Sequence, residues 1–270
     1  MPLNPRDRGL AYGDGVFETV RVAASGEAPL WSRHRARMVA GLHALDIALP
    51  DQSRLDAALN EGIAALRGEP GVVKLTVTRG VGGRGYLPPA SAKPTVLWQS
   101  GELPAWSERL RREGLVLGLC QTPLYPEPLA GFKHLNRLPQ VMARREVAGQ
   151  GWDEGLLLST RRQPLEATSM NLFARFADHW WMPDLAAAGA GVVGVMRSHL
   201  FDTLQQQGEK VICDLRPLSQ LRTADGLFLC NSIVGVLPVR KLAQWHWPVL
   251  ASVRELQQST ETFLAGSLKG

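Results

Sequence analysis

The sequence predicts an α+β protein built from two unequal domains. Strand-like and helix-like segments are interspersed along the 270 residues, and no internal repeat is evident. The apolar fraction of 45% and the charged fraction of 20% are those of an ordinary globular protein. The composition turns polar over residues 101–112 and then becomes apolar again. We therefore predict a small N-terminal α/β domain over residues 1–113 and a larger mixed C-terminal domain over residues 114–270.

The N-terminal domain is expected to combine strands with two helices. Residues Val16–Val22 are rich in β-branched and aromatic side chains, which favour a strand. Apolar residues at helical spacing predict one helix from Ser32, its N-cap, to about Ile47, and a second over Asp51–Arg67. Two further strands are expected around a glycine-rich loop: Gly71–Arg79 and Pro94–Gln99, with the loop at Gly80–Gly85.

The C-terminal domain is expected to open with a strand at Leu115–Cys120. A loop then leads to Lys133, and a helix continues to about Ala148. Short strands follow through Met182, and a glycine-rich loop precedes the next helix. The remaining elements are that loop at Ala188–Gly194, helices around Met196–Gln207 and Pro248–Leu264, and strands near Val211–Leu215, Leu227–Cys230 and Val236–Val239.

Charge and hydropathy exclude several classes of function. The net charge is +5, but the basic residues are spread along the chain, and the densest run, Arg33–Arg37, has no interleaved aromatics. This pattern favours small anionic substrates over nucleic acid. No apolar run approaches the ~18 residues of a membrane span, and the first residues do not resemble a signal peptide. We therefore predict a cytoplasmic protein without nucleic-acid or membrane partners.

Three features could suggest chemistry, and each has a simpler explanation. Residues Gly80–Gly85 match G-x-G-x-x-G, but Pro88 and Pro89 follow, so no helix can open there to bind a dinucleotide. The six histidines lack the short spacing of a metal site, so no metal is expected. The cysteines form no CxxC pair, and we interpret them as buried thiols: Cys120, Cys213 and Cys230.

Lys133 is the candidate for an amine nucleophile. It stands in Phe132-Lys133-His134-Leu135-Asn136-Arg137, where apolar and cationic neighbours could lower the pKa of its amine. On this ground alone a solvated lysine is the commoner case.

The wider pattern resembles the fold-type IV pyridoxal phosphate enzymes, which include branched-chain aminotransferases, D-amino-acid aminotransferases and aminodeoxychorismate lyases. The resemblance runs from about Asp7 to Val239, and its segments occur in the family's order. Those segments are Asp7-Arg8-Gly9 with Tyr12–Thr19, the His34–Arg37 helix, Lys133–Arg137, Glu166 before Asn171-Leu172-Phe173, Gly191–Arg197, and Cys230-Asn231-Ser232.

The resemblance implies pyridoxal 5′-phosphate as cofactor and gives the matching residues roles. Lys133 would carry the cofactor as a Schiff base, and Glu166 would keep the pyridine nitrogen protonated. Arg37 would grip the phosphate bidentately, although a solvated helix arginine is the alternative. Backbone N–H groups where a loop becomes a helix suit a phosphate dianion. The remaining cofactor-binding candidates are Val195, Met196, Asn231 and Ser232.

Within this family, three segments look like the lyases that convert 4-amino-4-deoxychorismate to 4-aminobenzoate and pyruvate for folate biosynthesis. They are Arg79–Tyr86, Lys133–Leu138 and Phe17–Thr19; branched-chain aminotransferases usually carry tyrosine at the place of Leu138. A D-amino-acid or branched-chain aminotransferase is the alternative. The lyase substrate is a dicarboxylate amine. Its expected contacts, which can act across a homodimer interface in this family, are Thr19, Arg84 and Tyr86.

One departure concerns the first strand. Family members usually begin with an extra strand before the Asp-Arg-Gly segment, and only six residues precede Asp7 here. We therefore expect the N-terminal sheet to have an unpaired edge strand or a truncated first strand.

Overall fold

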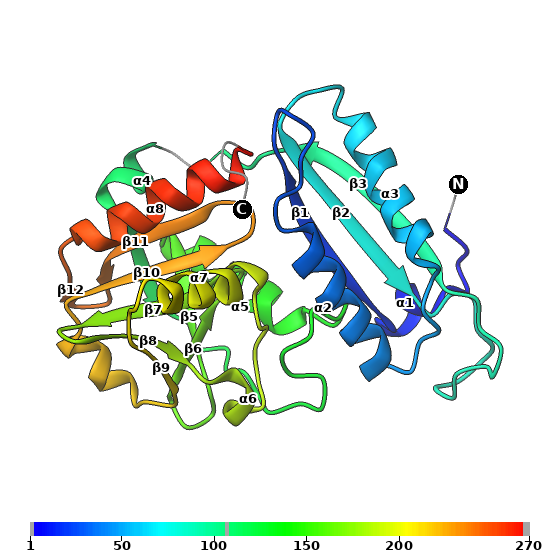
Figure 1. The fold of residues 1–270 in the computed structure, drawn as a ribbon. Helices are drawn as coiled ribbons and strands as arrows, with labels where there is room; N and C mark the ends of the chain where they lie inside the picture. The colour runs from blue at the N-terminus through cyan, green and yellow to red at the C-terminus, as the bar shows by residue number, and fades with distance from the viewer. Residues whose placement is uncertain (1–2, 106–107, 267–270) are drawn as a thin grey trace. The chain divides into compact units, whose positions relative to one another are not determined.

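The computed structural model describes residues 3–105 and 108–266 (Figure 1). Residues 106–107, within the polar stretch that predicts a domain boundary, lie outside the described residues. By their contacts, the described residues form two compact units. Unit 1 comprises residues 3–103, 132–137 and 264–266, and unit 2 comprises the rest. The boundary after residue 113 stays a prediction, because a grouping of contacts does not test which part folds independently.

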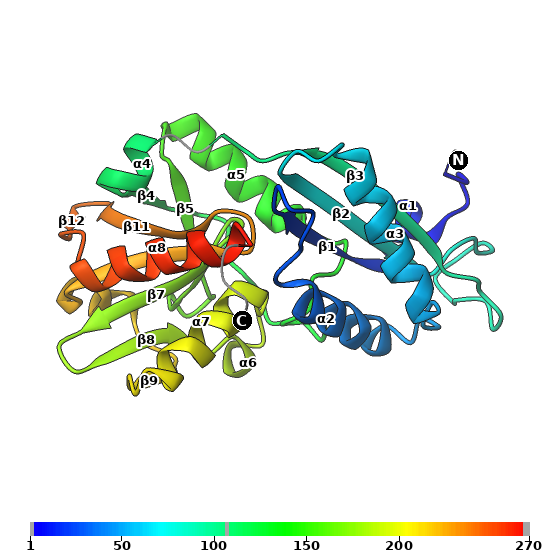
Figure 2. The ribbon, with the colours of Figure 1, turned by 45° about the horizontal axis from the view of Figure 1, so that its top comes forward.

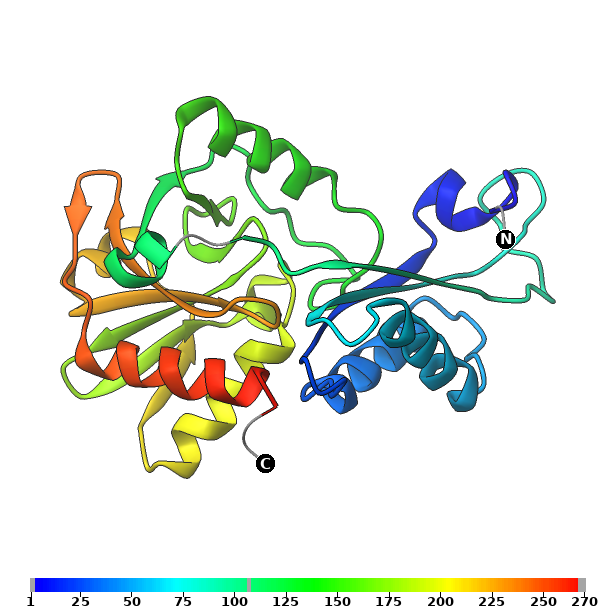
Figure 3. The ribbon, with the colours of Figure 1, turned by 90° about the horizontal axis from the view of Figure 1, so that it is seen from above.

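Unit 1 contains a three-stranded antiparallel sheet among its described residues. The order is β1 (Gly15–Val22), β2 (Gly71–Thr78) and β3 (Thr95–Glu102). Figures 1 and 3 show α2 (Trp31–Ala44) and α3 (Gln52–Ala65) against the same face of this sheet. Buried side chains alternate along β1 and β2, because successive strand residues point to opposite faces. These side chains and the apolar stripes of the two helices form the core of unit 1.

The helix starts in unit 1 agree only in part with the sequence prediction. Asp51 caps α3, since its carboxylate accepts the N–H of Ser53 at 3.0 Å. Ser32 as the N-cap of α2 is wrong: that helix begins at Trp31, after Leu30, without a side-chain cap. The N–H of Trp31 bonds to the carbonyl of Ala28 at 2.9 Å, so a tight backbone turn starts the helix earlier.

The segment 132–137 belongs to unit 1 and runs beside the first strand. The N–H of Phe17 donates to the carbonyl of Lys133 at 3.0 Å, and the N–H of Leu135 donates to the carbonyl of Gly15 at 3.0 Å. Val16 and His134 form an isolated bridge between these bonds. The start of β1, an edge strand of this sheet, is therefore paired with the Lys133 segment.

Unit 2 is built on a nine-stranded mixed sheet within the described residues. β7 pairs with β10 along one edge and with β6 and β8 along the other, so six strands close into a ring with β8 and β9 as a branch. The strands are β4 (Leu115–Leu119), β5 (Glu154–Leu158), β6 (Pro164–Ala167), β7 (Asn171–Phe176), β8 (His179–Pro183), β9 (Val211–Asp214), β10 (Gly226–Asn231), β11 (Gly235–Leu242) and β12 (Trp245–His246).

Helices lie around this ring (Figure 2), and buried apolar side chains from its strands form one continuous core. α5 (Leu138–Gln150) packs against β5, and α7 (Val195–Gln206) packs against β10. The other helical segments of unit 2 are α4 (Glu108–Glu113), α6 (Leu185–Ala188), the 3-10 helix η1 (Leu218–Thr223) and α8 (Ala251–Leu264). None of the described helices is long and apolar enough to cross a membrane.

The α+β class is confirmed, and most predicted elements lie within a few residues of their expected bounds. The sequence prediction missed short helices. α1 (Arg8–Tyr12) and α6 are too short to show an apolar period, and each begins after an aspartate cap, Asp7 and Asp184. The backbone of α1 positions Arg8, whose contacts are described below.

Candidate active site

Lys133 lies beside β1 in unit 1. Its carbonyl accepts the N–H of Phe17, which anchors the backbone, and its Nζ lies 4.5 Å from the centroid of the Phe17 ring. The side chain is half-buried. An aromatic face attracts a cation, so this contact holds the amine at the edge of the sheet, where the sequence alone would allow a fully solvated lysine.

Behind this strand, Glu18 is buried between Arg37 and His34 of α2. Arg37 donates from Nε and Nη2 to the two carboxylate oxygens at 2.7 and 2.6 Å, and His34 Nδ1 lies 2.6 Å from Oε2. The Glu18 and His34 side chains are each 1% exposed, and the Arg37 side chain is 13% exposed. Arg37 is therefore no solvated helix residue. Arg37 is predicted to donate two hydrogen bonds to the phosphate. These must come from N–H groups other than the two that donate to Glu18.

The charges of this group are set by burial and pairing. Burial raises the pKa of Glu18, but the charge of Arg37 and hydrogen bonds from His34 and Arg37 outweigh it and lower the pKa to about 2. Burial lowers the pKa of His34, against the opposing effect of Glu18. The ionised carboxylate only accepts hydrogen bonds, so His34 Nδ1 carries the proton, and His34 Nε2 has no partner in the described residues.

The three predicted substrate contacts also belong to unit 1, on two separate segments. Thr19 lies in β1 opposite Lys74 and is half-buried. Arg84 and Tyr86 lie in the loop between β2 and β3, and both are exposed. Tyr86 is 85% exposed, and the centroid of its ring is 5.5 Å from that of the Tyr12 ring. The next element after this loop is the strand β3 and not the helix that a dinucleotide-binding motif would open.

In unit 2, Glu166 is a buried carboxylate held by a loop. It lies on β6, it is 4% exposed, and its Oε2 accepts the N–H of Val192 at 2.8 Å. Gly191 packs so closely that an added Cβ would lie 3.1 Å from this oxygen, and its φ of 88° also favours glycine. Asn171, the β7 partner of Glu166, donates from Nδ2 to the carbonyl of Val192 at 2.9 Å. Glu166 is therefore a buried acid and not a surface glutamate at a strand edge.

The same loop leads into the N-terminus of α7. Val195 and Met196 are its first two residues, and both side chains are buried, so their backbone groups are the chemically relevant part. Gly194 stands at the N-cap, and no side chain of the described residues caps this turn. The first N–H groups of a helix lack intrahelical acceptors and carry the positive end of its dipole. The turn has the donors and the field that suit a phosphate dianion.

Asn231 is the last residue of β10, whose end pairs with the start of β7, and Ser232 follows it. Asn231 Oδ1 accepts the N–H groups of Ile233 and Val234, both at 2.9 Å, and its Nδ2 donates to the carbonyl of Ser169 at 3.2 Å. Asn231 therefore shapes this turn and ties it to the β6–β7 hairpin. Ser232 is half-buried within the turn.

The predicted site residues thus form two groups, one in each unit. Unit 1 brings Lys133 close to Phe17, and the next strand residue, Glu18, pairs with Arg37. Unit 2 gathers Glu166, the loop before α7 and the turn after β10. Gly131, which precedes Lys133 by two residues, belongs to unit 2 and exchanges backbone hydrogen bonds with Gly191 and Val193 at 2.8 and 3.0 Å.

Other groups in the structure do not offer comparable chemistry. Burial raises the pKa of the Cys120 and Cys230 thiols to about 12, with nearby carboxylates adding to the effect at Cys120, so neither is a nucleophile at neutral pH. Cys213 is exposed, which corrects the prediction that all three are buried. The described residues contain no group of three or more histidine, cysteine, aspartate or glutamate side chains that could hold a metal.

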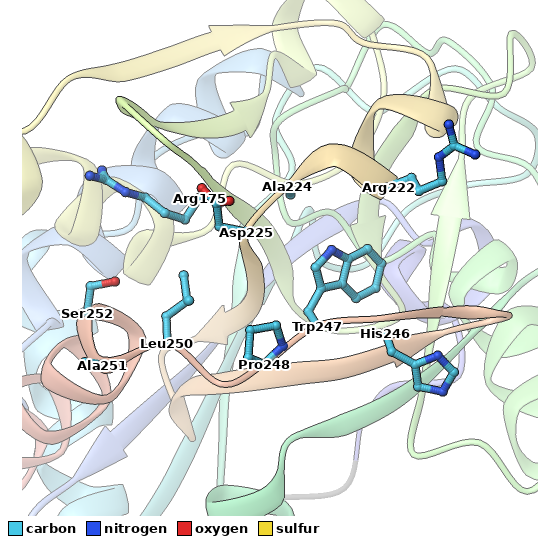
Figure 4. Close-up of a pocket in the computed structure, with 10 residues that line it drawn as sticks. All are labelled: Arg175, Arg222, Ala224, Asp225, His246, Trp247, Pro248, Leu250, Ala251 and Ser252. Atoms are coloured by element: carbon cyan, nitrogen blue, oxygen red, sulfur yellow. The ribbon is translucent and has the colours of Figure 1, made fainter.

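A shallow cavity of about 700 Å³ in unit 2 contains none of the predicted site residues. Figure 4 shows its two arginines, Arg175 and Arg222, at opposite ends. Arg175 is already paired with Glu209 at 2.6 Å. The cavity lacks the converging polar groups of a ligand site.

Comparison with known proteins identifies the family. The family described as amino-transferase class IV matches residues 15–242. The chain belongs to the class IV aminotransferases. The fold-type IV family predicted from the sequence is confirmed.

Two relatives are similar over almost the whole chain. An aminodeoxychorismate lyase from Vibrio harveyi is 35% identical over 97% of this chain and 96% of its own. The crystal structure of 4-amino-4-deoxychorismate lyase from Pseudomonas aeruginosa is 43% identical, with a TM-score of 0.92 over 98% of this chain and 96% of that chain. The PLP-bound form of a hypothetical aminotransferase from Mycobacterium tuberculosis, 21% identical with a TM-score of 0.84 over 99% and 95%, shares the fold.

For this member of the class IV aminotransferase family, the sequence prediction missed the partners of the site residues. The sequence marks Glu18 only as part of the Tyr12–Thr19 and Phe17–Thr19 segments, and His34 only as the start of the His34–Arg37 segment. The alternation of buried residues along Val16–Val22 places Glu18 on the same face as Val16 and Val20, which is a signal for a buried acid. An acid on the core face needs a cation, and the helix that follows supplies it.

Proposed function

We propose that this protein is an aminodeoxychorismate lyase that converts 4-amino-4-deoxychorismate to 4-aminobenzoate and pyruvate with pyridoxal 5′-phosphate as cofactor. The observation that carries the proposal is the similarity to lyases of this activity, at 35% and 43% identity over 97% and 98% of the chain. We infer a cytoplasmic enzyme of folate biosynthesis from the same relation.

The side chains fit the cofactor. The phosphate needs a cation and N–H donors: Arg37 in unit 1 is such a cation, and the first turn of α7 in unit 2, at Val195 and Met196, has N–H groups that no side chain of the described residues caps. Asn231 and Ser232 add a turn with further polar groups. The pyridine nitrogen needs a buried anion to stay protonated, and Glu166 is an acid 4% exposed whose Oε2 is fixed by a backbone N–H. Lys133 supplies the amine that would bind the cofactor covalently.

When bound, pyridoxal phosphate withdraws electrons from the carbon that bears the substrate amine. The Lys133 amine would take the proton from that carbon and return it to the methylene carbon of the departing enolpyruvyl group, which gives the methyl group of pyruvate. Glu166 holds the proton on the pyridine nitrogen. Arg84, Tyr86 and Thr19 bind the two substrate carboxylates. Loss of the enolpyruvyl group as pyruvate leaves an aromatic ring, which makes the reaction effectively irreversible.

The deciding experiment measures pyruvate and 4-aminobenzoate released from 4-amino-4-deoxychorismate by the cofactor-loaded protein. We expect equal amounts of both products, and none with the Lys133→Ala variant. The alternative, a D-amino-acid or branched-chain aminotransferase, predicts instead that amino groups pass from D-alanine or leucine to a keto acid. Amino-group transfer without pyruvate release from the chorismate would overturn the lyase proposal.

Lys133 as the attachment point has its own test. Borohydride reduction of the yellow, cofactor-loaded protein should leave a pyridoxyl group on Lys133, detected by peptide mapping. The label on another lysine, or no label, would remove the central assignment. Lys74, which lies 5.0 Å from the same Phe17 ring through its Nζ, is the internal control and should stay unlabelled.

We further propose a homodimer. Two groups of large apolar side chains are exposed, and such patches indicate interaction surfaces more often than isolated residues do. Leu138, Val141 and Met142, 74%, 52% and 50% exposed, share one face of α5, because residues three and four apart are neighbours on a helix. The second group, in unit 1, is Leu10, Tyr86 and Leu87.

A further inference from the structure

Arg8 is buried, although its neighbours Arg6 and Leu10 are exposed. Only 4% of Arg8 is accessible, and arginines are almost never so deeply buried unless they are paired. Nothing in the proposed reaction uses this side chain. Its contacts therefore call for a separate explanation.

The guanidinium group of Arg8 joins α1 to the loop that carries Arg84 and Tyr86. Nη1 donates to the carbonyl of Gly85 at 3.1 Å, and Nη2 donates to the carbonyl of Tyr86 at 2.7 Å. Nε donates to Asp14 at 2.8 Å. Only a planar group with several fixed donors can bind two successive carbonyls and a carboxylate at once, and a lysine ammonium cannot reproduce this geometry.

The third contact fixes the arginine itself. Asp14 accepts two hydrogen bonds from Arg79, at 2.7 and 3.1 Å, and Arg79 in turn donates to the carbonyls of Leu45 and Asp46. Arg8 is thus attached through Asp14 to the end of α2, in the core part of unit 1. The carbonyls of Gly85 and Tyr86 are therefore bound to an arginine that is itself fixed by Asp14.

The stem of Arg8 packs against the same loop. A Cβ added to Gly82 would lie 2.5 Å from Arg8 Cδ, and the guanidinium is anchored at its other end, so the stem cannot easily move aside. The Tyr12 ring lies 4.7 Å from Arg8 Cζ and 5.5 Å from the Tyr86 ring. Backbone bonds complete the contact: Arg8 N–H to the Gly80 carbonyl and Gly82 N–H to the Arg6 carbonyl, at 2.9 and 3.2 Å.

We propose that Arg8 is a positioning residue that holds the Gly82–Tyr86 loop so that Arg84 meets a carboxylate of the substrate; this inference rests on the proposed function. The Arg84 side chain is exposed and makes no hydrogen bond or ion pair within the described part of the chain, while the two carbonyls that follow it are fixed. An ordered backbone with an available cation lowers the entropy lost when an anion binds. Arg8 therefore acts on substrate affinity, through the loop, without touching the substrate.

Two variants test this role from different sides. Arg8→Lys keeps the charge but loses the paired donation to the carbonyls of Gly85 and Tyr86. Gly82→Ala leaves the guanidinium intact and pushes on its stem. Arg6→Lys is the matched control, because that arginine is in the same segment but its side chain is exposed and has no partner among the described residues. Circular dichroism melts identify any variant that fails to fold, and the other variant then decides.

The first measurement is the rate at which trypsin cuts the Arg84–Gly85 bond in the holoenzyme, followed by mass spectrometry. We expect at least tenfold faster cleavage in both Arg8→Lys and Gly82→Ala, and an unchanged rate in Arg6→Lys. Wild-type cleavage rates in both test variants would overturn the proposal. The cleavage rate does not depend on the reaction. A wild type without lyase activity would overturn the proposed function, and the cleavage rates would still test the contact between Arg8 and the loop.

The second measurement separates a positioning role from a purely structural one. In an active lyase, both test variants should raise KM for 4-amino-4-deoxychorismate at least fivefold, with kcat and the visible cofactor spectrum within twofold of wild type. An unchanged KM despite faster cleavage would overturn the substrate part of the proposal. A loss of kcat and of the cofactor spectrum together would assign Arg8 to general folding and would also overturn it.

Discussion

A substitution of Glu166 distinguishes an enzyme from a protein that only binds the cofactor. Glu166→Gln keeps the size and the acceptor for the Val192 N–H but removes the negative charge that would hold a proton on the pyridine nitrogen. We expect kcat and kcat/KM to fall together by at least tenfold, or about 1.4 kcal/mol, because the charge matters most in the transition state. Turnover within about twofold of wild type would show that Glu166 is not the pyridine partner.

Arg37 is the residue on which the phosphate contact depends. Arg37→Ala should weaken cofactor binding by about 2–3 kcal/mol if its hydrogen bonds are charge-assisted. Equilibrium dialysis of the cofactor measures this directly. Arg35→Ala is the control on the same helix, since Arg35 pairs with Asp56 at 3.4 Å and should leave the dissociation constant unchanged. Equal affinities for wild type and Arg37→Ala would limit Arg37 to its ion pair with Glu18.

At the scale of elements, the Glu18 pair fastens α2 to β1, and its strength depends on pH. The pKa of Glu18 is about 2 in the folded protein, below its ordinary 4.5, so the pair stabilises the fold above pH 4.5. This stability is lost as the pH falls from 4.5 towards 2. The pKa of His34 is lowered from 6.5, so its protonation also makes the fold less stable as the pH falls, and this effect begins at a higher pH than that of Glu18.

We therefore expect a difference between wild type and Glu18→Gln in urea unfolding as a function of pH. Between about pH 5 and about pH 3, wild type should lose on the order of 2 kcal/mol more than the variant, by linkage from the Glu18 pKa. Parallel curves for the two proteins would show that Glu18 is not ionised and paired in the folded state. The other carboxylates titrate in both proteins and cancel in the difference.

At the scale of the whole molecule, the prediction concerns assembly. A wild-type mass of twice 29.5 kDa by light scattering is expected, and Leu138→Glu should shift it towards one chain by placing a charge on the exposed face of α5. Leu49→Glu is the matched control, because Leu49 is an exposed leucine, at 45%, outside both apolar groups. A wild-type mass of one chain would refute the homodimer.

The sequence by itself determined the order and type of most elements. Local rules suffice for these: alternation along Val16–Val22 predicts β1, and helical spacing with Asp51 as cap predicts α3. Two prolines after Gly80–Gly85 exclude a nucleotide-binding helix. The family followed from motifs in order along the chain, because each motif is a short contiguous segment.

Only the tertiary structure decided what the key side chains contact. Glu18 and Arg37 are 19 residues apart, and Arg8 meets the carbonyls of Gly85 and Tyr86 across 77 and 78 residues. No local period encodes such pairs, since they form when strands and helices pack and a buried charge must find a partner. The burial of Glu166 beside Val192 likewise arises where β6 meets the loop before α7, a meeting that the sheet topology creates.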